Sequence, residues 1–169
     1  MAGTSPAMTG ERRESMPQTI EDRLAALGIV LPTATPPQAN YVPTVTSGSQ
    51  LYVSGQTPMA DGKLKFHGRV GAEVALADAQ AAARVCAINI LAQVKAALGS
   101  LERVERAVKV LGFVNSAPDF FDQGLVVNGA SDLFVEVLGE AGRHARSSVG
   151  VAALPGGAPV EVEAIFQIR

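Results

Sequence analysis

Cysteine, clusters of basic residues and long apolar runs are all scarce in this sequence, and each scarcity excludes a class of protein. The one cysteine, Cys86, cannot close an intramolecular disulfide, and the N-terminus has no apolar stretch such as a secretory signal needs. Both features favour the cytoplasm. Apolar runs are interrupted by glycine, proline or charge before they reach the roughly 20 residues that cross a bilayer. The sequence therefore predicts no membrane partner.

Basic side chains are not concentrated at any point in the chain. The formal net charge is −2, and no run of lysine or arginine occurs. A surface that holds phosphate backbones needs a positive patch, so nucleic acid is a poor candidate partner. The chain has 169 residues, of which 47% are hydrophobic and 18% are charged. This size and composition are typical of one packed domain.

Composition divides the chain into three segments. Residues 1–18 are rich in small, polar and charged types without periodicity, and we interpret them as a flexible leader. Residues 19–37 contain a predicted short helix, with capping-box spacing at Thr19 and Asp22, followed by a proline-rich linker. The main domain is expected over residues 38–169.

The main domain shows seven elements in its hydrophobic pattern, with glycines or prolines at most of their ends. In chain order they are strands 41–46 and 50–56, helix 75–98, strand 104–114, helix 118–139, and strands 146–151 and 160–168. The first two strands and the last two strands are each expected to form a hairpin. The order β-β-α-β-α-β-β predicts an α+β fold in which two long helices cover one face of a mixed sheet.

The last expected hairpin concentrates charge on one face. Alternation along a strand places Glu161 and Glu163 on the face that points away from the helices. The same alternation, with the valines of strand 146–151 turned toward the helices, places Arg146, Ser148 and Gly150 on that face as well. We therefore expect Arg146 and Glu163 to lie close together, with Ser148 directly across from Glu163.

Two interpretations of this charged face stay open. Charges on the open face of an antiparallel sheet are most often simply solvated. The face also carries Ile165, Ser148 and Gly150, however, so another subunit could cover it. A covered arginine can hold a carboxylate through two parallel charge-assisted hydrogen bonds, and a nearby glutamate can orient or deprotonate a water molecule.

Three fragments of the sequence together resemble the signature of the Rid family, also called YjgF or L-PSP. They are Ala145-Arg146-Ser147-Ser148-Val149-Gly150-Val151 followed by Leu154-Pro155, the strand Val160-Glu161-Val162-Glu163-Ala164-Ile165, and Ser54-Gly55-Gln56 at the end of an upstream strand. The matches cover most of residues 39–168. The resemblance implies a chorismate-mutase-like fold that forms a homotrimer, with sites in the clefts between subunits.

The resemblance also implies roles for particular residues. Arg146 corresponds to the arginine that binds the substrate carboxylate, and Glu163 to the acid that handles water. The further ligand-lining positions that it implies are Tyr41, Ser54, Gly55, Ser148 and Asn128. The sequence departs from the family pattern at Ser148, where many members have cysteine, in the surroundings of Tyr41, and in the extra N-terminal helix.

These features together predict the hydrolysis of reactive 2-enamino or 2-imino acids to 2-keto acids and ammonia, without cofactor or metal. His67 and His144 have no second ligand at metal spacing, and Cys86 is expected in the core. The alternative is a non-catalytic trimeric protein that binds small carboxylates or regulates in response to them. A third activity attached to some family names, that of a ribonuclease or translation inhibitor, is disfavoured because the chain lacks a basic patch.

Overall fold

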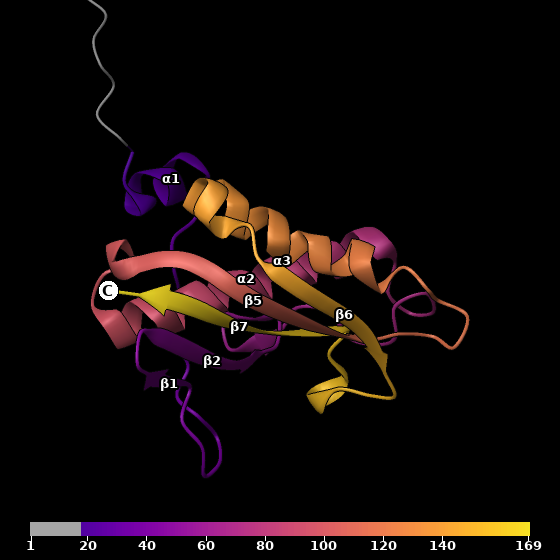
Figure 1. Ribbon diagram of the computed structural model, residues 1–169. Helices are drawn as coiled ribbons and strands as arrows, with labels where there is room; N and C mark the ends of the chain where they lie inside the picture. The colour runs from indigo at the N-terminus through magenta and orange to yellow at the C-terminus, as the bar shows by residue number, and fades with distance from the viewer. Residues whose placement is uncertain (1–17) are drawn as a thin grey trace, which may run out of the picture.

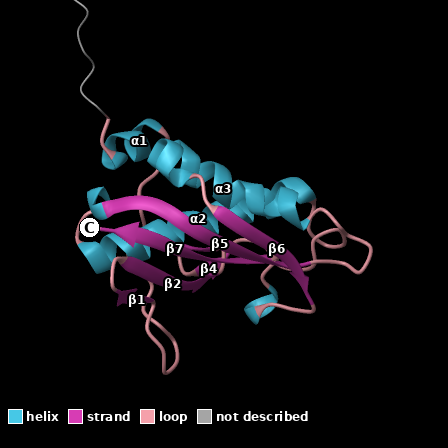
Figure 2. Ribbon diagram, in the orientation of Figure 1, coloured by secondary structure: helices cyan, strands magenta, loops and turns pink. Residues whose placement is uncertain are grey.

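The computed structural model describes residues 18–169 and places two long helices along one face of a five-stranded mixed sheet (Figure 1). The strands lie in the order β1 (Thr44–Ser47), β2 (Gln50–Gln56), β7 (Val160–Ile168), β5 (Val104–Asn115) and β6 (Ala145–Val151). The helices are α1 (Ile20–Ala26), α2 (Leu76–Leu98) and α3 (Gln123–Leu138). A small separate hairpin, β3 (Met59–Ala60) with β4 (Lys63–Leu64), precedes α2 (Figure 2). The predicted α+β class and the order of the seven main elements are confirmed.

Glycine ends several elements where the sequence predicted that they would end. The β1–β2 hairpin turns at Gly48, whose φ is +59°, and α2 stops at Gly99, whose φ is +77°. Both values lie in the left-handed region that residues with a Cβ rarely adopt. The first strand begins at Thr44 and not at residue 41, because Pro43 cannot donate a backbone hydrogen bond to a ladder.

Helix α3 begins five residues later than the sequence predicted. Residues 116–122 form a loop that is held to another part of the chain, since the Ala117 backbone amide donates to the Val70 carbonyl at 2.9 Å. Phe121, which falls within the range predicted as helix, lies in this loop and is 81% exposed. Contacts with the loop around Val70 therefore override the helical spacing over residues 118–122.

Helix α1 has the capping box that the sequence predicted and packs onto the main domain. The Thr19 side chain accepts from the Asp22 backbone amide, and the Asp22 side chain accepts from the Thr19 amide. Ile20 and Leu24 are buried, and Arg23 donates to the Val137 carbonyl of α3 at 3.2 Å. The expected leader lies outside the described residues apart from its last residue.

The second hairpin predicted from the sequence is wrong. Strands β6 and β7 are not neighbours, because β5 lies between them and pairs with both. Strand β6 runs parallel to β5, whereas β7 runs antiparallel to it. The cause is the connection through α3, since a strand that follows a crossover helix is placed parallel to the strand before the helix. The loop after β6 then carries the chain past the end of β5.

This topology reverses the face that was predicted for β6. Arg146 is level with Val110 on β5, and Val110 is level with Ala164 on β7. Residues that are level on neighbouring strands point to the same side of a sheet. Val110 and Ala164 are buried under the helices, so Arg146 points toward the helices, as Ser148 does two residues further along. Glu163 points to the opposite, open face.

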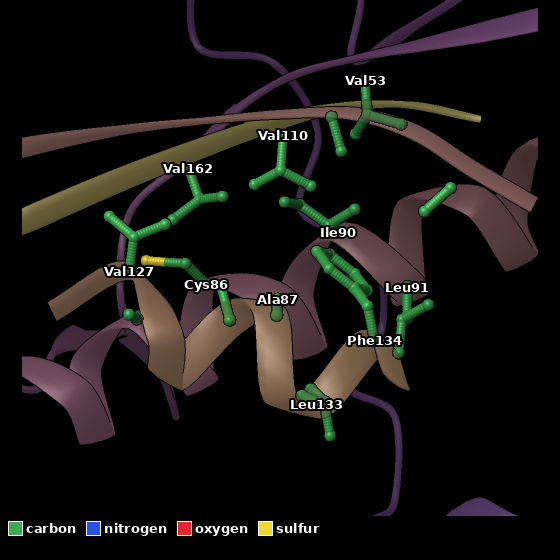
Figure 3. Close-up of a cluster of buried hydrophobic side chains, with 14 of the residues drawn as sticks. Val53, Cys86, Ala87, Ile90, Leu91, Val110, Val127, Leu133, Phe134 and Val162 are labelled. Atoms are coloured by element: carbon green, nitrogen blue, oxygen red, sulfur yellow. The ribbon is translucent and has the colours of Figure 1, made fainter. Parts of the chain in front are cut away.

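The core lies between the sheet and the two long helices. Figure 3 shows Phe134 of α3 and Ile90 of α2 beneath Val110 and Val162 of the sheet. Cys86 is fully buried in this cluster, and burial raises the pKa of its thiol well above the ordinary value. The thiol therefore stays protonated, which agrees with its predicted role as a small core residue.

Helix α2 corrects the expectation that no segment is long and apolar enough to cross a membrane. The helix has 23 residues, and a window of it has a mean hydropathy of 1.4, so by length and composition alone it could cross a membrane. Half of this window is buried inside the protein, and the buried residues pack against the sheet and α3. A long helix in the centre of a protein core is apolar because it is buried, so it meets the same criterion of length and composition.

Candidate functional site

The residues predicted for the site fall into two groups on opposite sides of the sheet. The first, which we call the arginine group, consists of Arg146, Ser148 and Asn128, on β6 and α3. The second, the glutamate group, consists of Glu163, Tyr41, Ser54 and Gly55, around the β2–β7 pair. Arg146 is hydrogen-bonded to Asn128 in the first group, and Ser54 and Gly55 stand opposite Glu163 in the second. The structure does not bring the two groups together within one chain.

In the arginine group, α3 holds the guanidinium of Arg146 from one side. Its Nη1 donates to Asn128 Oδ1 at 2.8 Å and to Ser131 Oγ at 3.1 Å. Asn128 and Ser131 are three residues apart on α3, so their side chains share one face of the helix. Among residues 18–169, no carboxylate forms an ion pair with Arg146. The side chain is exposed, so its other N–H groups can reach an external anion.

Ser148 lies on the same face of β6 as Arg146 and is level with Gly112 of β5. Its Oγ is buried and has no hydrogen-bond partner among the described residues. A buried hydroxyl without a partner carries a desolvation cost that a ligand atom or a water molecule can remove. The predicted position of Ser148 directly across from Glu163 is wrong, because β5 separates the two strands.

A β-bulge defines the glutamate group. Val53 is paired with Ala164, and Gln56 is paired with Val162, so both Ser54 and Gly55 stand opposite Glu163. Such an extra residue bends a strand and redirects its side chains, and bulges are frequent beside active sites. The bulge therefore brings Ser54 and Gly55 of the Ser-Gly-Gln fragment opposite the predicted acid Glu163.

Gly55 leaves room for the Glu161 carboxylate, because a Cβ at position 55 would force the end of that flexible side chain to move. The neighbouring Ser54 fixes the segment before β1, with its backbone amide donating to the Pro43 carbonyl at 2.9 Å and its Oγ donating to the Val42 carbonyl at 2.8 Å. Tyr41, on the same segment, is half exposed. These contacts hold Tyr41 near the bulge.

A hollow of about 460 Å³ opens beside the bulge, between the proline-rich linker and the end of β2. Tyr41 and Gly55 line it, whereas Glu163 and Ser54 do not. Several polar residues of its wall were not predicted from the sequence, namely Glu161, Gln38, Gln56, His67, Asn89 and Gln93. Glu161 could have been predicted from the sequence, because strand alternation places it on the same face as Glu163. The others come from separate elements, and only the folded chain gathers them.

Glu161 contributes a carboxyl group to the wall of this hollow, and the environment of this group changes its pKa. It is half buried, and burial, followed by the nearby charge of Glu163, raises its pKa above the ordinary value. Both causes disfavour the ionised form. Glu161 therefore holds a proton at a pH where an exposed glutamate has lost it.

We expect Glu161→Gln to stabilise the protein at pH 8 relative to wild type. A carboxyl whose pKa is raised on folding contributes its stability in full below the pKa of the unfolded chain and loses it as the pH rises through the folded pKa. Glutamine does not ionise, so the gain in melting temperature should shrink as the pH falls toward about 4. Thermal unfolding from pH 4 to 8 measures this, with the exposed Glu105→Gln as control. An equal gain at every pH would contradict the expectation.

The distance between the two groups overturns the prediction that Arg146 and Glu163 lie together in one chain. They are two strands apart, which corresponds to roughly 10 Å across the sheet, and they point to opposite faces. The open face that carries Glu163 is not purely polar. Leu111, Phe113 and Ile165 are only partly buried there, and Tyr52 and Val149 are each 42% exposed.

Metal ligands do not gather at either group. Within residues 18–169, no cluster of three or more histidine, cysteine, aspartate or glutamate side chains could hold a metal ion. The chemistry available from the residues described is therefore anion binding by Arg146, hydrogen bonding by hydroxyl and amide groups, and proton transfer by the two glutamates.

Comparison with known proteins finds close relatives of this chain. A family model described as "YjgF/chorismate mutase-like, putative endoribonuclease" matches residues 21–160. The protein TCP17 of Trypanosoma cruzi is 53% identical over 147 residues, which make up 86% of this chain and 92% of that protein. The crystal structure of Atu1372 from Agrobacterium tumefaciens, a protein of unknown function, is 56% identical with a TM-score of 0.84, covering 89% of this chain and 92% of that one.

A more distant structure was solved with a small molecule. It is E. coli TdcF with bound serine, which is 28% identical with a TM-score of 0.59, covering 80% of this chain and 93% of TdcF. Serine carries a carboxylate and an amino group on one carbon atom. A chain similar to this one therefore binds a ligand of that chemical class.

Proposed function

Because this chain belongs to the YjgF/chorismate mutase-like family, which includes the Rid and L-PSP proteins, we propose that it hydrolyses reactive 2-enamino or 2-imino acids to 2-keto acids and ammonia. The observation that carries the proposal is the state of Arg146. Its guanidinium is held in place by Asn128 and Ser131, yet no carboxylate of the described residues occupies it. A guanidinium in this state is suited to bind the carboxylate of a small substrate.

The proposed site requires two subunits. Arg146 and Glu163 point to opposite faces of one sheet, so a short substrate cannot touch both in the same chain. A second copy that covers the open face would bury Tyr52, Val149 and the other apolar side chains there and could bring its own Arg146 to Glu163. We propose a homotrimer with this arrangement, which the resemblance to the family also implied.

The proposed chemistry uses the two groups in different steps. Arg146 holds the substrate carboxylate, which fixes the imine carbon relative to the neighbouring subunit's glutamate group. Water adds to that carbon of the protonated imine while Glu163 accepts one proton of the water, and a neutral carbinolamine forms. Glu163 then returns the proton to the nitrogen. As the C–N bond breaks, Glu163 takes the proton of the carbinolamine hydroxyl, so that ammonia leaves, the 2-keto acid remains, and the ammonia finally removes the proton from Glu163. Oxidation states do not change, so the reaction needs no redox cofactor.

The direct test supplies a freshly generated 2-imino acid, made by a dehydratase from serine or threonine, and follows its disappearance. We expect the purified protein to accelerate the loss above the spontaneous rate, in proportion to its concentration. The heat-denatured protein is the control. If the rate with protein equals the spontaneous rate, the proposal that this protein hydrolyses imino acids is wrong.

The second candidate is a trimeric protein that binds small carboxylates without turnover. The departures from the family pattern at Ser148 and around Tyr41 are the features that favour it, and the buried Ser148 hydroxyl has no partner among the described residues. Calorimetric titration with pyruvate separates the two candidates when it is combined with the rate assay, because binding without acceleration supports this second function. Ribonuclease activity stays disfavoured, since the net charge is −2 and no run of lysine or arginine is present.

A further inference from the structure

Ser131, which holds the Arg146 guanidinium, is itself hydrogen-bonded to His144, a residue that the proposed site does not include. His144 Nδ1 lies 2.6 Å from the Gly142 carbonyl oxygen, and His144 Nε2 lies 2.9 Å from Ser131 Oγ. Ser131 Oγ in turn accepts from Arg146 Nη1 at 3.1 Å. The His144 ring also packs edge-on against the Phe134 ring of the core, with 6.0 Å between the ring centroids. The ring is thus fixed by both packing and hydrogen bonding.

The chemistry of these groups sets the direction of each hydrogen bond. A carbonyl oxygen can only accept, so Nδ1 of His144 carries the hydrogen that is donated to Gly142. In the neutral ring Nε2 is then an acceptor, and the Ser131 hydroxyl donates to it. This leaves the lone pairs of Ser131 Oγ directed at the arginine. Burial, and then the charge of Arg146, lower the pKa of His144, which favours the neutral ring that this arrangement needs.

We propose that Ser131 and His144 are positioning residues that hold the Arg146 guanidinium ready for a carboxylate. The proposal rests on the function proposed above for Arg146. Asn128 and Ser131 together hold Nη1, and this leaves Nη2 and Nε to face the ligand. An arginine that is already held in place loses less conformational freedom on binding than a free one.

The first test follows Arg146 itself and needs no ligand. In nuclear magnetic resonance spectra of the guanidinium N–H groups, a held arginine gives a separate, slowly exchanging signal, which Arg146→Lys assigns by its loss. We expect this signal in wild type and in Ser131→Thr, which keeps the hydroxyl. It should be lost in Ser131→Ala and in His144→Phe, which keeps an aromatic ring against Phe134 but removes the acceptor.

The second test measures binding of pyruvate by the full chain. We expect Ser131→Ala and His144→Phe to weaken binding roughly tenfold, as expected for the loss of one hydrogen bond of about 1.4 kcal/mol. Ser131→Thr should restore most of it. In the Arg146→Ala background, Ser131→Ala should have no further effect, because Ser131 acts only through the arginine. The exposed neighbour on the same helix, Asp132→Asn, is the matched control.

Each result bears on a different part of the proposal. An Arg146 signal that survives in both Ser131→Ala and His144→Phe would overturn the positioning role. A signal that is lost without any change in affinity would overturn its importance for the ligand. If wild type binds no pyruvate while the Arg146 signal behaves as expected, the proposed function fails and the positioning of the arginine stands. If Ser131→Ala does not fold, His144→Phe provides both measurements.

Discussion

Arg146→Ala is expected to weaken the binding of a small 2-keto acid such as pyruvate by about 2 to 5 kcal/mol, the range for removing one partner of a hydrogen-bonded charge pair. Arg146 carries the positive charge among the three residues of the arginine group. Its planar guanidinium can donate two parallel hydrogen bonds to a carboxylate. Arg146→Lys should recover little of the loss, because an ammonium group cannot reproduce that geometry. Isothermal titration measures both variants.

A matched control for this change is Arg143→Ala. Arg143 is also exposed and lies three residues away, but its partner is Glu140, at 3.1 Å. The control should leave pyruvate binding unchanged. Light scattering and thermal unfolding should show that Arg146→Ala keeps the oligomeric state and melts at a similar temperature. If the assembly or the fold is lost instead, Arg146 supports an interface, and its assignment to the site would have to be withdrawn.

Glu163→Gln is expected to reduce the rate of imine hydrolysis by about 10² to 10⁴-fold, the usual contribution of a general acid–base group. Glutamine has nearly the same shape, but it cannot accept a proton from the attacking water. Pyruvate binding should change much less than the rate, because Arg146 remains. The control is Glu105→Gln, an exposed glutamate of β5. A rate that stays within a few-fold of wild type would show that water is activated by another group, of which Glu161 is the nearest candidate.

Mixing these two variants tests whether the site lies between subunits. If one chain supplies Arg146 and its neighbour supplies Glu163, oligomers assembled from Arg146→Ala and Glu163→Gln chains contain some clefts with both native residues. Co-refolding the two inactive proteins should then restore a fraction of the wild-type rate. A mixture that remains as inactive as its parents, while mass spectrometry shows that mixed oligomers have formed, would show that the two residues do not meet in one cleft between subunits.

The candidate residues could be found from the sequence, but their arrangement could not. Alternation along β7 correctly placed Glu161 and Glu163 on one face, since the buried residues of that strand are apolar throughout. Strand β6 has no such signal, because none of its residues is fully buried and its valines at 149 and 151 lie on the open face. The prediction turned those valines toward the helices and so turned Arg146 the wrong way.

The kinds of element, most of their ends and the residues able to do chemistry follow from the local sequence, because hydrophobic period, glycine stops and side-chain type are local properties. Tertiary structure alone decided that β6 pairs with β5, that Arg146 faces α3, and that Ser131 and His144 hold it. The two-residue repeat of a strand shows which residues share a face, but it does not show which of the two faces meets the core. That choice was made by the α3 crossover, through contacts between residues far apart in the chain.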